Sequence, residues 1–166
     1  MEVYSKSTNM KITFQAHRGD ALISRAIRLL SPKYNHISIR IEDTVYEAHI
    51  GTGVTETSYK TWKGKKTVVA KKSIEVDLMT GLKVLDFLFN QVGKKYDVLG
   101  IFAFIWIFFK PRKDRWYCSE LAQVVLYKIL GIRSTAENYN QKVSPFTFWD
   151  NLKSVEKALA LNSKVV

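Results

Sequence analysis

The stretch "HISIRIEDTVYEAHI", residues 36–50, decides how this chain folds. Its first six residues alternate between polar and apolar side chains, which is the period of a strand with one buried face. Three isoleucines share the apolar face, whereas His36, Ser38 and Arg40 share the polar one. "EDT" then supplies a turn, and "VYEAHI" (45–50) returns as a second strand. The stretch therefore predicts an antiparallel hairpin that buries its isoleucine face.

Further strands and helices flank this hairpin. "MKITFQA" (10–16) alternates well enough for a strand, and "KTVVAKKSIEVD" (66–77) supplies strand material for another antiparallel pair. Apolar residues at helical spacing predict helices that start near these positions: Asp20, Leu82, Ser119 and Pro145. The sequence thus predicts an α+β fold, a small antiparallel sheet with helices packed on it. We expect a single domain over residues 1–166, with its core at about 10–160.

The predicted helices carry start and stop signals. Asp20 is the N-cap of the first helix, which Ser31-Pro32 ends. Gly93 ends the helix that starts near Leu82, and Gly131 ends the helix that starts at Ser119. Ser144 is the N-cap of the last helix. The second helix is expected to bury one stripe: Leu82, Leu85, Phe89 and Val92.

The composition is typical of a globular protein. Of the 166 residues 46% are hydrophobic and 25% charged, which excludes a disordered chain. The single cysteine excludes an internal disulfide framework and fits a reducing compartment. The amino-terminal "MEVYSKSTNMKITF" lacks the basic and apolar regions of a secretory signal. We therefore expect a cytoplasmic protein.

The net charge of +11 is concentrated in two clusters, "KTWKGKKTVVAKK" (60–72) and "KPRKDR" (110–115). Such clusters attract anionic partners, either nucleic acid or acidic lipid head groups. They also occur as solvated faces that keep a protein soluble. We favour the solvated face over nucleic acid, because no nucleic-acid-binding motif accompanies the charge.

The most apolar stretch is "VLGIFAFIWIFF", residues 98–109. It falls short of the ~20 residues that a helix needs to cross a bilayer. Its basic flanks suit a segment that dips into an anionic membrane interface. A helix or strand buried in the core is the alternative that its length favours.

The only cysteine, Cys118, lies in "DRWYCSEL" (114–121), where a loop turns into a predicted helix. Free backbone N–H groups and the helix dipole favour a thiolate at such a position, and the thiolate is the nucleophile. The same N–H groups, that of Ser119 included, can form an oxyanion hole. An inert thiol is the alternative, since single cysteines are often structural.

A cysteine nucleophile needs a base, and three histidines are candidates. His36 opens a strand on the face opposite the isoleucines, so its ring is available to another element. His49 lies in the partner strand, and His17 in the loop before the first helix. Each alone is compatible with a structural role. Zinc bound by the three histidines and Cys118 is a weaker alternative, because the sequence has no short ligand pair.

The order of several short motifs resembles a known family. "LISRAIRLLSPKYNHISIRI", "VYEA", "GKKYD" and "WYCSELA" follow one another as in the circularly permuted NlpC-like cysteine hydrolases, a papain-fold group. The nearest branch is similar to the YiiX-like proteins of bacteria and their phages, with poxvirus relatives and a more distant link to lecithin retinol acyltransferases. The resemblance covers roughly Gly19 to Leu130. It implies a protein that a phage or virus could encode and use in a host cell.

The resemblance assigns roles to four residues. It implies that Cys118 is the nucleophile, His36 the general base and Glu47 of "VYEA" the residue that orients the base. Tyr96 of "GKKYD" matches the family's site tyrosine, which binds the substrate or steadies the oxyanion. In permuted members the histidine strands precede the cysteine helix, as they do here.

Hairpin geometry leaves the orienting residue open. If Asp43-Thr44 makes a two-residue turn, Glu47 faces Arg40 and lies about 13 Å along the strand from His36. His49 is then the nearer diagonal neighbour. The resemblance therefore favours Glu47, with a carboxylate that stabilises imidazolium, and simple geometry favours His49. We choose Glu47.

These features predict a cysteine hydrolase that cleaves an amide or ester through a thioester, without metal or organic cofactor. The substrate is either a peptide, such as a cell-wall cross-link, or a lipid-like acyl ester reached at an anionic membrane. A non-catalytic binding module on the same fold is the alternative from another class. Nothing in the sequence indicates the oligomeric state.

Overall fold

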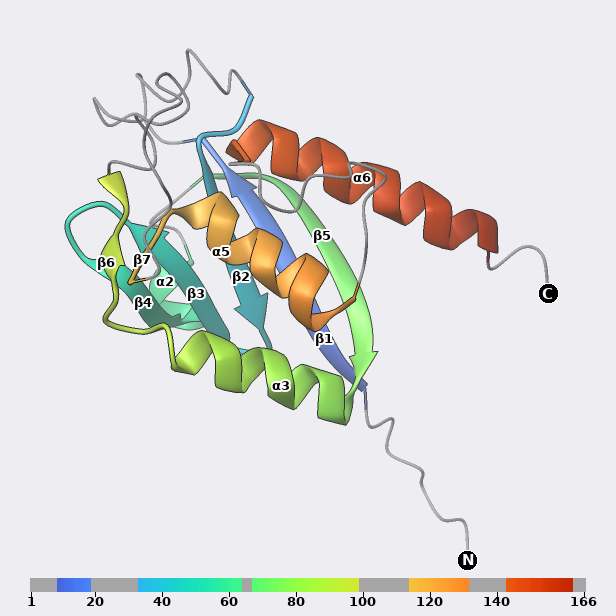
Figure 1. Cartoon of the computed structure of the whole chain (residues 1–166), viewed down its shortest axis with the longest axis horizontal. Coiled ribbons are helices and arrows are strands. Elements are labelled where there is room, and N and C mark those ends of the chain that lie inside the picture. Colours follow the sequence, from blue (N-terminus) through green and yellow to red (C-terminus); the bar gives the residue numbers. More distant parts are fainter. Residues whose placement is uncertain (1–8, 19–32, 64–66, 99–113, 132–142, 163–166) are drawn as a thin grey trace, which may run out of the picture.

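The computed structural model describes residues 9–18, 33–63, 67–98, 114–131 and 143–162. These residues form a five-stranded sheet with helices packed against it (Figure 1). The α+β architecture expected from the sequence is therefore confirmed. The predicted helix at 20–30 and nearly all of the apolar stretch 98–109 lie outside the described residues.

The sheet has five strands in the order β4-β3-β2-β1-β5, and all neighbours are antiparallel. The strands are β1 (Asn9–His17), β2 (His36–Ile41), β3 (Thr44–His49), β4 (Gly53–Ser58) and β5 (Val68–Asp77). The predicted strands at 10–16 and 36–41 are confirmed. Within the predicted segment 66–77, the described residues form one long strand, β5, which pairs with β1, rather than a further antiparallel pair. Strand β4 was not predicted from the sequence.

The β2–β3 hairpin turns at Glu42 and Asp43. Ile41 pairs with Thr44, and Glu42 has a φ of 48°. A positive φ is typical of the tight hairpin turns whose twist matches that of the strands. The turn lies within the predicted "EDT", one residue before the Asp43-Thr44 turn that the register estimate assumed. When a two-residue turn moves by one position along the chain, the partner of every residue in the hairpin shifts by two positions. Every pair between β2 and β3 therefore differs from the one that the assumed turn gives.

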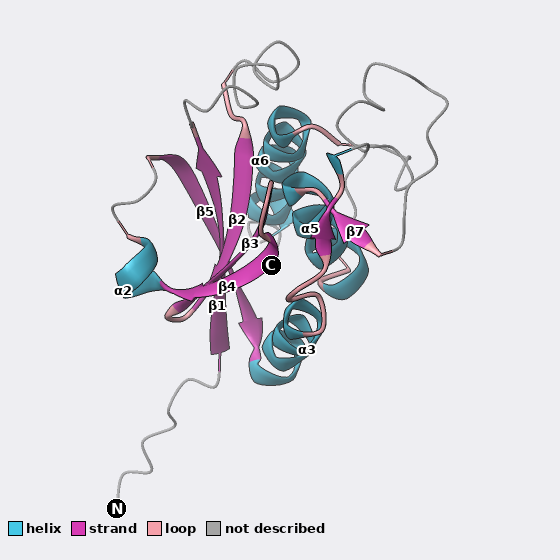
Figure 2. Cartoon of the chain, turned by 90° about the vertical axis from the view of Figure 1, so that its left-hand side faces the viewer, coloured by secondary structure: helices cyan, strands magenta, loops and turns pink. Residues whose placement is uncertain are grey.

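The longer helices cover one face of the sheet (Figure 2). They are α3 (Leu78–Phe89), α5 (Cys118–Val124), which a π-helical turn η1 (Val125–Ile129) prolongs, and α6 (Pro145–Asn162). The short helix α2 (Tyr59–Trp62) lies on the opposite face. Two short parallel strands, β6 (Lys95–Tyr96) and β7 (Arg115–Trp116), form a separate sheet that lies beside β4.

The core lies between the sheet and these helices. Ile37, Ile39 and Ile41 are each 1% exposed, so the isoleucine face is buried as predicted. Phe14 of β1 packs against Phe148 of α6, with 5.5 Å between ring centroids. Within the described residues, no helix is both long enough and apolar enough to cross a membrane.

Helix α3 differs from its prediction in both start and orientation. It begins at Leu78, because Asp77 caps it by accepting a hydrogen bond from the Thr80 N–H at 2.9 Å. The buried stripe is Gly81, Val84 and Leu88. Three residues of the predicted stripe, Leu82, Phe89 and Val92, are instead exposed, so that prediction was wrong. Helical spacing alone did not decide which of two adjacent apolar stripes faces the sheet.

The last two helices follow the sequence more closely. Helix α5 starts at Cys118, one residue before the predicted start, and Gly131 follows its π-helical continuation with a φ of 64°. Ser144 caps α6, as predicted, by accepting a hydrogen bond from the Thr147 N–H at 3.1 Å. The start of α5 thereby places the lone cysteine at a helix N-terminus.

Candidate active site

Cys118 is the first residue of α5, and Tyr117 before it is in an extended conformation. The thiol is free, and the residue is 5% exposed. Burial raises the pKa of the Cys118 thiol and is the largest single effect, whereas the charge of His36 and a side-chain hydrogen bond with His36 lower this pKa. Backbone N–H groups of Ile37 and Ser119 lower this pKa further, and the net result lies below the ordinary value. The surroundings of the sulfur therefore favour a thiolate paired with an imidazolium.

His36 opens β2 and meets Cys118 from the sheet side. Its Nε2 lies 2.8 Å from Oε2 of Glu47, and both side chains are largely buried. Because Nε2 is engaged by the carboxylate, Nδ1 is the ring nitrogen that remains for the thiol. The three residues form a hydrogen-bonded chain that runs from sulfur through imidazole to carboxylate. This is the order that nucleophilic catalysis by cysteine requires.

The register of the hairpin explains how Glu47 reaches His36. Ile39 pairs with Tyr46 and Ile41 with Thr44. Continued by three residues beyond Ile39 and Tyr46, this register puts His36 opposite His49 and makes Glu47 the diagonal neighbour of His36. Diagonal partners lie within reach of long side chains. The expected distance of about 13 Å therefore does not apply, since it rested on the wrong turn.

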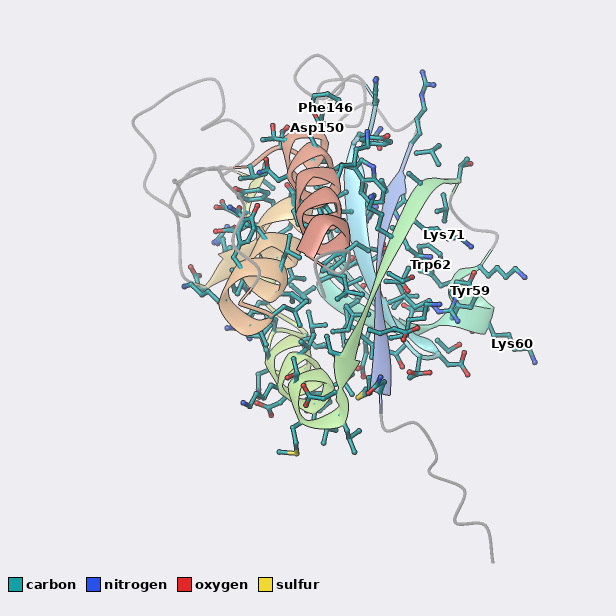
Figure 3. All side chains as sticks on the ribbon, turned by 90° about the vertical axis from the view of Figure 1, so that its right-hand side faces the viewer. Tyr59, Lys60, Trp62, Lys71, Phe146 and Asp150 are labelled. Atoms are coloured by element: carbon teal, nitrogen blue, oxygen red, sulfur yellow. The ribbon has the colours of Figure 1, made fainter. Side chains whose placement is uncertain are left out.

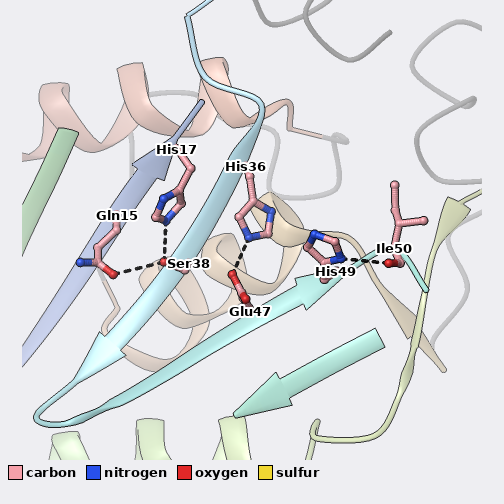
Figure 4. A network of polar contacts seen from close by, with 7 residues as sticks. All are labelled: Gln15, His17, His36, Ser38, Glu47, His49 and Ile50. Atoms are coloured by element: carbon pink, nitrogen blue, oxygen red, sulfur yellow. Dashed lines mark hydrogen bonds and ion pairs between the residues drawn. The ribbon is translucent and has the colours of Figure 1, made fainter. Parts of the chain in front are cut away.

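His49 stands beside His36 but bonds elsewhere. Its Nδ1–H donates to the carbonyl of Ile50 at 2.9 Å, and its ring meets that of His36 edge-on at 5.9 Å between centroids (Figure 4). The side chain is exposed. Of the two candidates for the orienting role, Glu47 is the one whose hydrogen bond to His36 the geometry shows.

Tyr96 in β6 faces the same sulfur. Burial raises the pKa of Tyr96 well above its ordinary value, and the charge of Cys118 and a side-chain hydrogen bond with Cys118 add to this. The phenol therefore stays protonated near neutral pH and can donate to the thiolate. Strand β6 is held against β4, because Val54 N–H donates to the Lys94 carbonyl at 2.8 Å and Gly93 N–H to the Val54 carbonyl at 2.9 Å. This clamp fixes the position of the phenol.

Ser119 contributes its backbone rather than its side chain. The hydroxyl donates to the Val143 carbonyl at 2.6 Å, and the residue is fully buried. The Ser119 N–H, by contrast, is directed at Cys118. The predicted oxyanion role of Ser119 can therefore involve only its backbone N–H, while its hydroxyl ties α5 to the segment that precedes α6.

The sequence reading missed a group of buried polar side chains next to His36. His17 ends β1 rather than lying in a loop, and it pairs with His36 in register. Its ring is 2% exposed and bonds to Ser38, which in turn bonds to Gln15 (Figure 4). Gln15 lies in the predicted strand 10–16, and His17 comes two residues later, directly after its predicted end, so continued alternation was the available signal.

The weaker zinc alternative finds no support in this part of the chain. Among the described residues, which include Cys118 and all three histidines, no group of three or more His, Cys, Asp or Glu side chains is arranged to hold a metal ion. Glu47 already takes one ring nitrogen of His36, and Ile50 takes one of His49.

Comparison with known proteins adds no further assignment. No family model matches this chain, and neither a curated protein nor a solved structure is significantly similar to it. The contacts of Cys118, His36, Glu47 and Tyr96 are therefore the observations that bear on function.

Proposed function

We propose that this protein is a cysteine hydrolase that cleaves an amide or ester bond through a thioester intermediate. The single observation that carries the proposal is the hydrogen-bonded chain from Cys118 through His36 to Glu47. A lowered thiol pKa beside a histidine that a carboxylate orients is the arrangement of an activated nucleophile. It also agrees with the resemblance to permuted NlpC-like hydrolases.

The residues perform the reaction in two halves. His36 takes the proton of Cys118, and the thiolate attacks the carbonyl carbon. Negative charge develops on the carbonyl oxygen, where N–H groups at the start of α5 and the Tyr96 hydroxyl can stabilise it. Protonated His36 then gives its proton to the leaving amine or alcohol, which leaves a thioester on Cys118.

Water completes the cycle with the same groups. His36 removes a proton from water, which attacks the thioester carbonyl and releases the acid while the thiol recovers its proton. Glu47 remains ionised throughout and stabilises the imidazolium of His36. None of these steps needs a metal or organic cofactor. Because the nucleophile must be reduced, the proposal fits a cytoplasmic setting, including that of a host cell.

The proposed fold is the circularly permuted papain-like one. Two features support it: antiparallel strands that carry the histidine precede the cysteine helix, and that helix packs on them. The order of these elements along the chain is that of permuted members.

A peptide amide is our primary choice of substrate class, and a lipid-like acyl ester is the second. The second is favoured by one specific observation. Along α3 and just after it, large apolar side chains are exposed: Leu78, Met79, Leu82, Phe89, Val92 and Val98. Val92 and Val98 of this set flank Tyr96 along the chain, which supports an apolar substrate at the site. Flotation with anionic and neutral vesicles tests this substrate class, and failure to bind either leaves the peptide amide.

Alkylation of the thiol tests the enzyme proposal directly. We expect iodoacetamide at pH 6 to label Cys118 faster than it labels free cysteine, and His36→Ala to remove the difference. Cys118→Ala is the control for label at other sites. A wild-type rate equal to that of free cysteine contradicts the proposal and favours a non-catalytic binding module.

Turnover is the second part of the test. Hydrolysis of p-nitrophenyl acetate and of a fluorogenic peptide library by wild type is expected to disappear in Cys118→Ala. Equal hydrolysis by wild type and Cys118→Ala contradicts a role for the thiol.

A further inference from the structure

We infer that His17 is a positioning residue for His36: its ring, anchored by Ser38, holds the base in line with Cys118. The inference rests on the proposed function, because it concerns how the same thiol is activated. It assigns a role to a buried histidine that the proposed reaction steps do not use.

The anchor of His17 is a short chain of buried polar groups. Ser38 has one hydroxyl hydrogen, which it donates to Oε1 of Gln15 at 3.3 Å. The Ser38 oxygen therefore accepts a hydrogen bond from His17, with 2.8 Å between Nε2 of His17 and Oγ of Ser38. The three residues are at most 3% exposed. Buried polar groups with defined partners fix side-chain orientation, because each alternative leaves a group without its hydrogen bond.

Ring contacts transmit this orientation to the base. The His17 and His36 rings lie 5.5 Å apart at a tilt of 44°. On its other side His17 meets the ring of Trp62 edge-on at 5.1 Å. Trp62 is 3% exposed and comes from α2, on the face of the sheet away from α6 (Figure 3). His17 is thus fixed between a buried indole and the catalytic imidazole.

The charge state of His17 also matters to the ion pair. A neutral ring leaves His36 free to hold the proton that it takes from Cys118. An imidazolium at His17 would put a like charge beside it and would lose solvation by burial. The hydrogen bond to Ser38 requires a proton on Nε2, and burial beside a protonated His36 disfavours a second proton on Nδ1. The arrangement therefore supports a neutral His17 next to a protonated His36.

Replacement of the anchor tests the inference. We expect Ser38→Ala to move the pH midpoint of Cys118 alkylation up by about one unit, which is about tenfold in rate at pH 6. Thr13→Ala is the matched control, because Thr13 lies on β1 and loses a comparable hydroxyl contact, to Ser73 at 2.9 Å, away from the site. Thr13→Ala is expected to leave the midpoint unchanged. Equal midpoints for wild type and Ser38→Ala overturn the inference.

The alkylation rate of Cys118 in the wild-type protein separates the two proposals. If wild-type Cys118 alkylates like free cysteine, the proposed function fails. If the wild-type thiol is activated and Ser38→Ala retains that activation, only the role of His17 fails.

A measurement on the unmodified protein covers the case in which a variant does not fold. In ¹H–¹⁵N spectra of the imidazole groups at pH 7, assigned with His49→Gln, we expect the His17 proton on Nε2. A proton on Nδ1, or a doubly protonated His17 ring, overturns the inference.

Discussion

Glu47 reaches the ring of His36 from the diagonal position of the neighbouring strand, with 2.8 Å between Oε2 and Nε2. The residue directly opposite His36 in the continued register is His49, whose own Nδ1–H bonds to Ile50. The orienting group is therefore the diagonal neighbour rather than the opposite one. A carboxylate at this position stabilises the protonated ring, which a neutral imidazole does less well.

Replacement of the two neighbours distinguishes their roles. We expect Glu47→Gln to slow iodoacetamide labelling of Cys118 at pH 6 by roughly tenfold, because the imidazolium loses its counter-charge. His49→Gln, the matched change at the exposed neighbour, should alter the rate less than about twofold. A larger effect of His49→Gln than of Glu47→Gln would assign the orienting role to His49.

The pH dependence of labelling follows from the lowered thiol pKa. His36 holds the pKa of Cys118 below its ordinary value in the folded protein, so the native state binds fewer protons at this thiol than the unfolded chain. The resulting stabilisation is present above the unfolded pKa and is lost as the pH falls through the folded pKa. Between these two values we expect wild-type labelling to persist. His36→Ala should lose about tenfold in rate per pH unit below about 8.5. Superimposable pH profiles for the two proteins would contradict the pairing.

Removal of the Tyr96 hydroxyl should affect turnover more than labelling. Tyr96→Phe keeps the buried ring but removes the donor that faces Cys118. If the hydroxyl stabilises the developing oxyanion, kcat is expected to fall by about 100-fold, as for other oxyanion donors. Thiol labelling should change only a few-fold. Comparison of kcat with the alkylation rate checks this, and an unchanged kcat would leave Tyr96 a structural role.

Ser119→Ala should weaken the fold without deactivating the thiol. The change leaves the buried Val143 carbonyl without the hydroxyl that donates to it at 2.6 Å. We expect a loss of about 1–3 kcal/mol in the free energy of unfolding. The backbone N–H that faces Cys118 is retained, so the pH midpoint of labelling should stay within experimental error. Denaturant unfolding and alkylation measure the two effects, and a displaced midpoint would give the hydroxyl a direct part in the chemistry.

Two glycines provide a matched test of the clamp that holds Tyr96. Gly53 has a φ of 76°, and a Cβ there would clash with the Lys94 carbonyl oxygen. Gly51 has a similar φ of 92°, but a Cβ there meets nothing within 4 Å. Both Ala variants incur backbone strain of about 1 kcal/mol or more, and only Gly53→Ala adds a steric clash of about 1–3 kcal/mol.

We therefore expect Gly53→Ala to lower the melting temperature more than Gly51→Ala does. It should also slow labelling of Cys118, because displacement of Lys94 moves Tyr96. Equal melting temperatures for the two variants would contradict the clamp.

The sequence predicted those parts of the molecule that follow from local patterns. The strict alternation of polar and apolar residues predicted β2, and Ser144 followed by Pro145 predicted the start of α6. The helix-start position of Cys118 followed from a change in periodicity. These signals depend on neighbouring residues, so a single sequence contains them in full.

The parts that the sequence did not predict depend on contacts between distant segments. The partner of His36 depended on a turn displaced by one residue, which hydrophobic pattern alone does not fix. The stripe that α3 buries depends on Met10, which packs against Gly81 from β1. His17 became relevant only when pairing placed it beside His36. The orienting role of Glu47 followed from the family resemblance, whereas a hairpin turn at Asp43-Thr44 favoured His49.

The ten-residue strand β5 pairs with β1 along one side only, which leaves its outer side as an edge of the sheet. Lys71 and Lys72 stand in the middle of this strand. Charged side chains on an exposed edge discourage another chain from adding to it. Among the described residues, the two lysines thus place positive charge along the edge of the sheet. Neutralising both would remove that charge, which is expected to ease the addition of a strand from another chain.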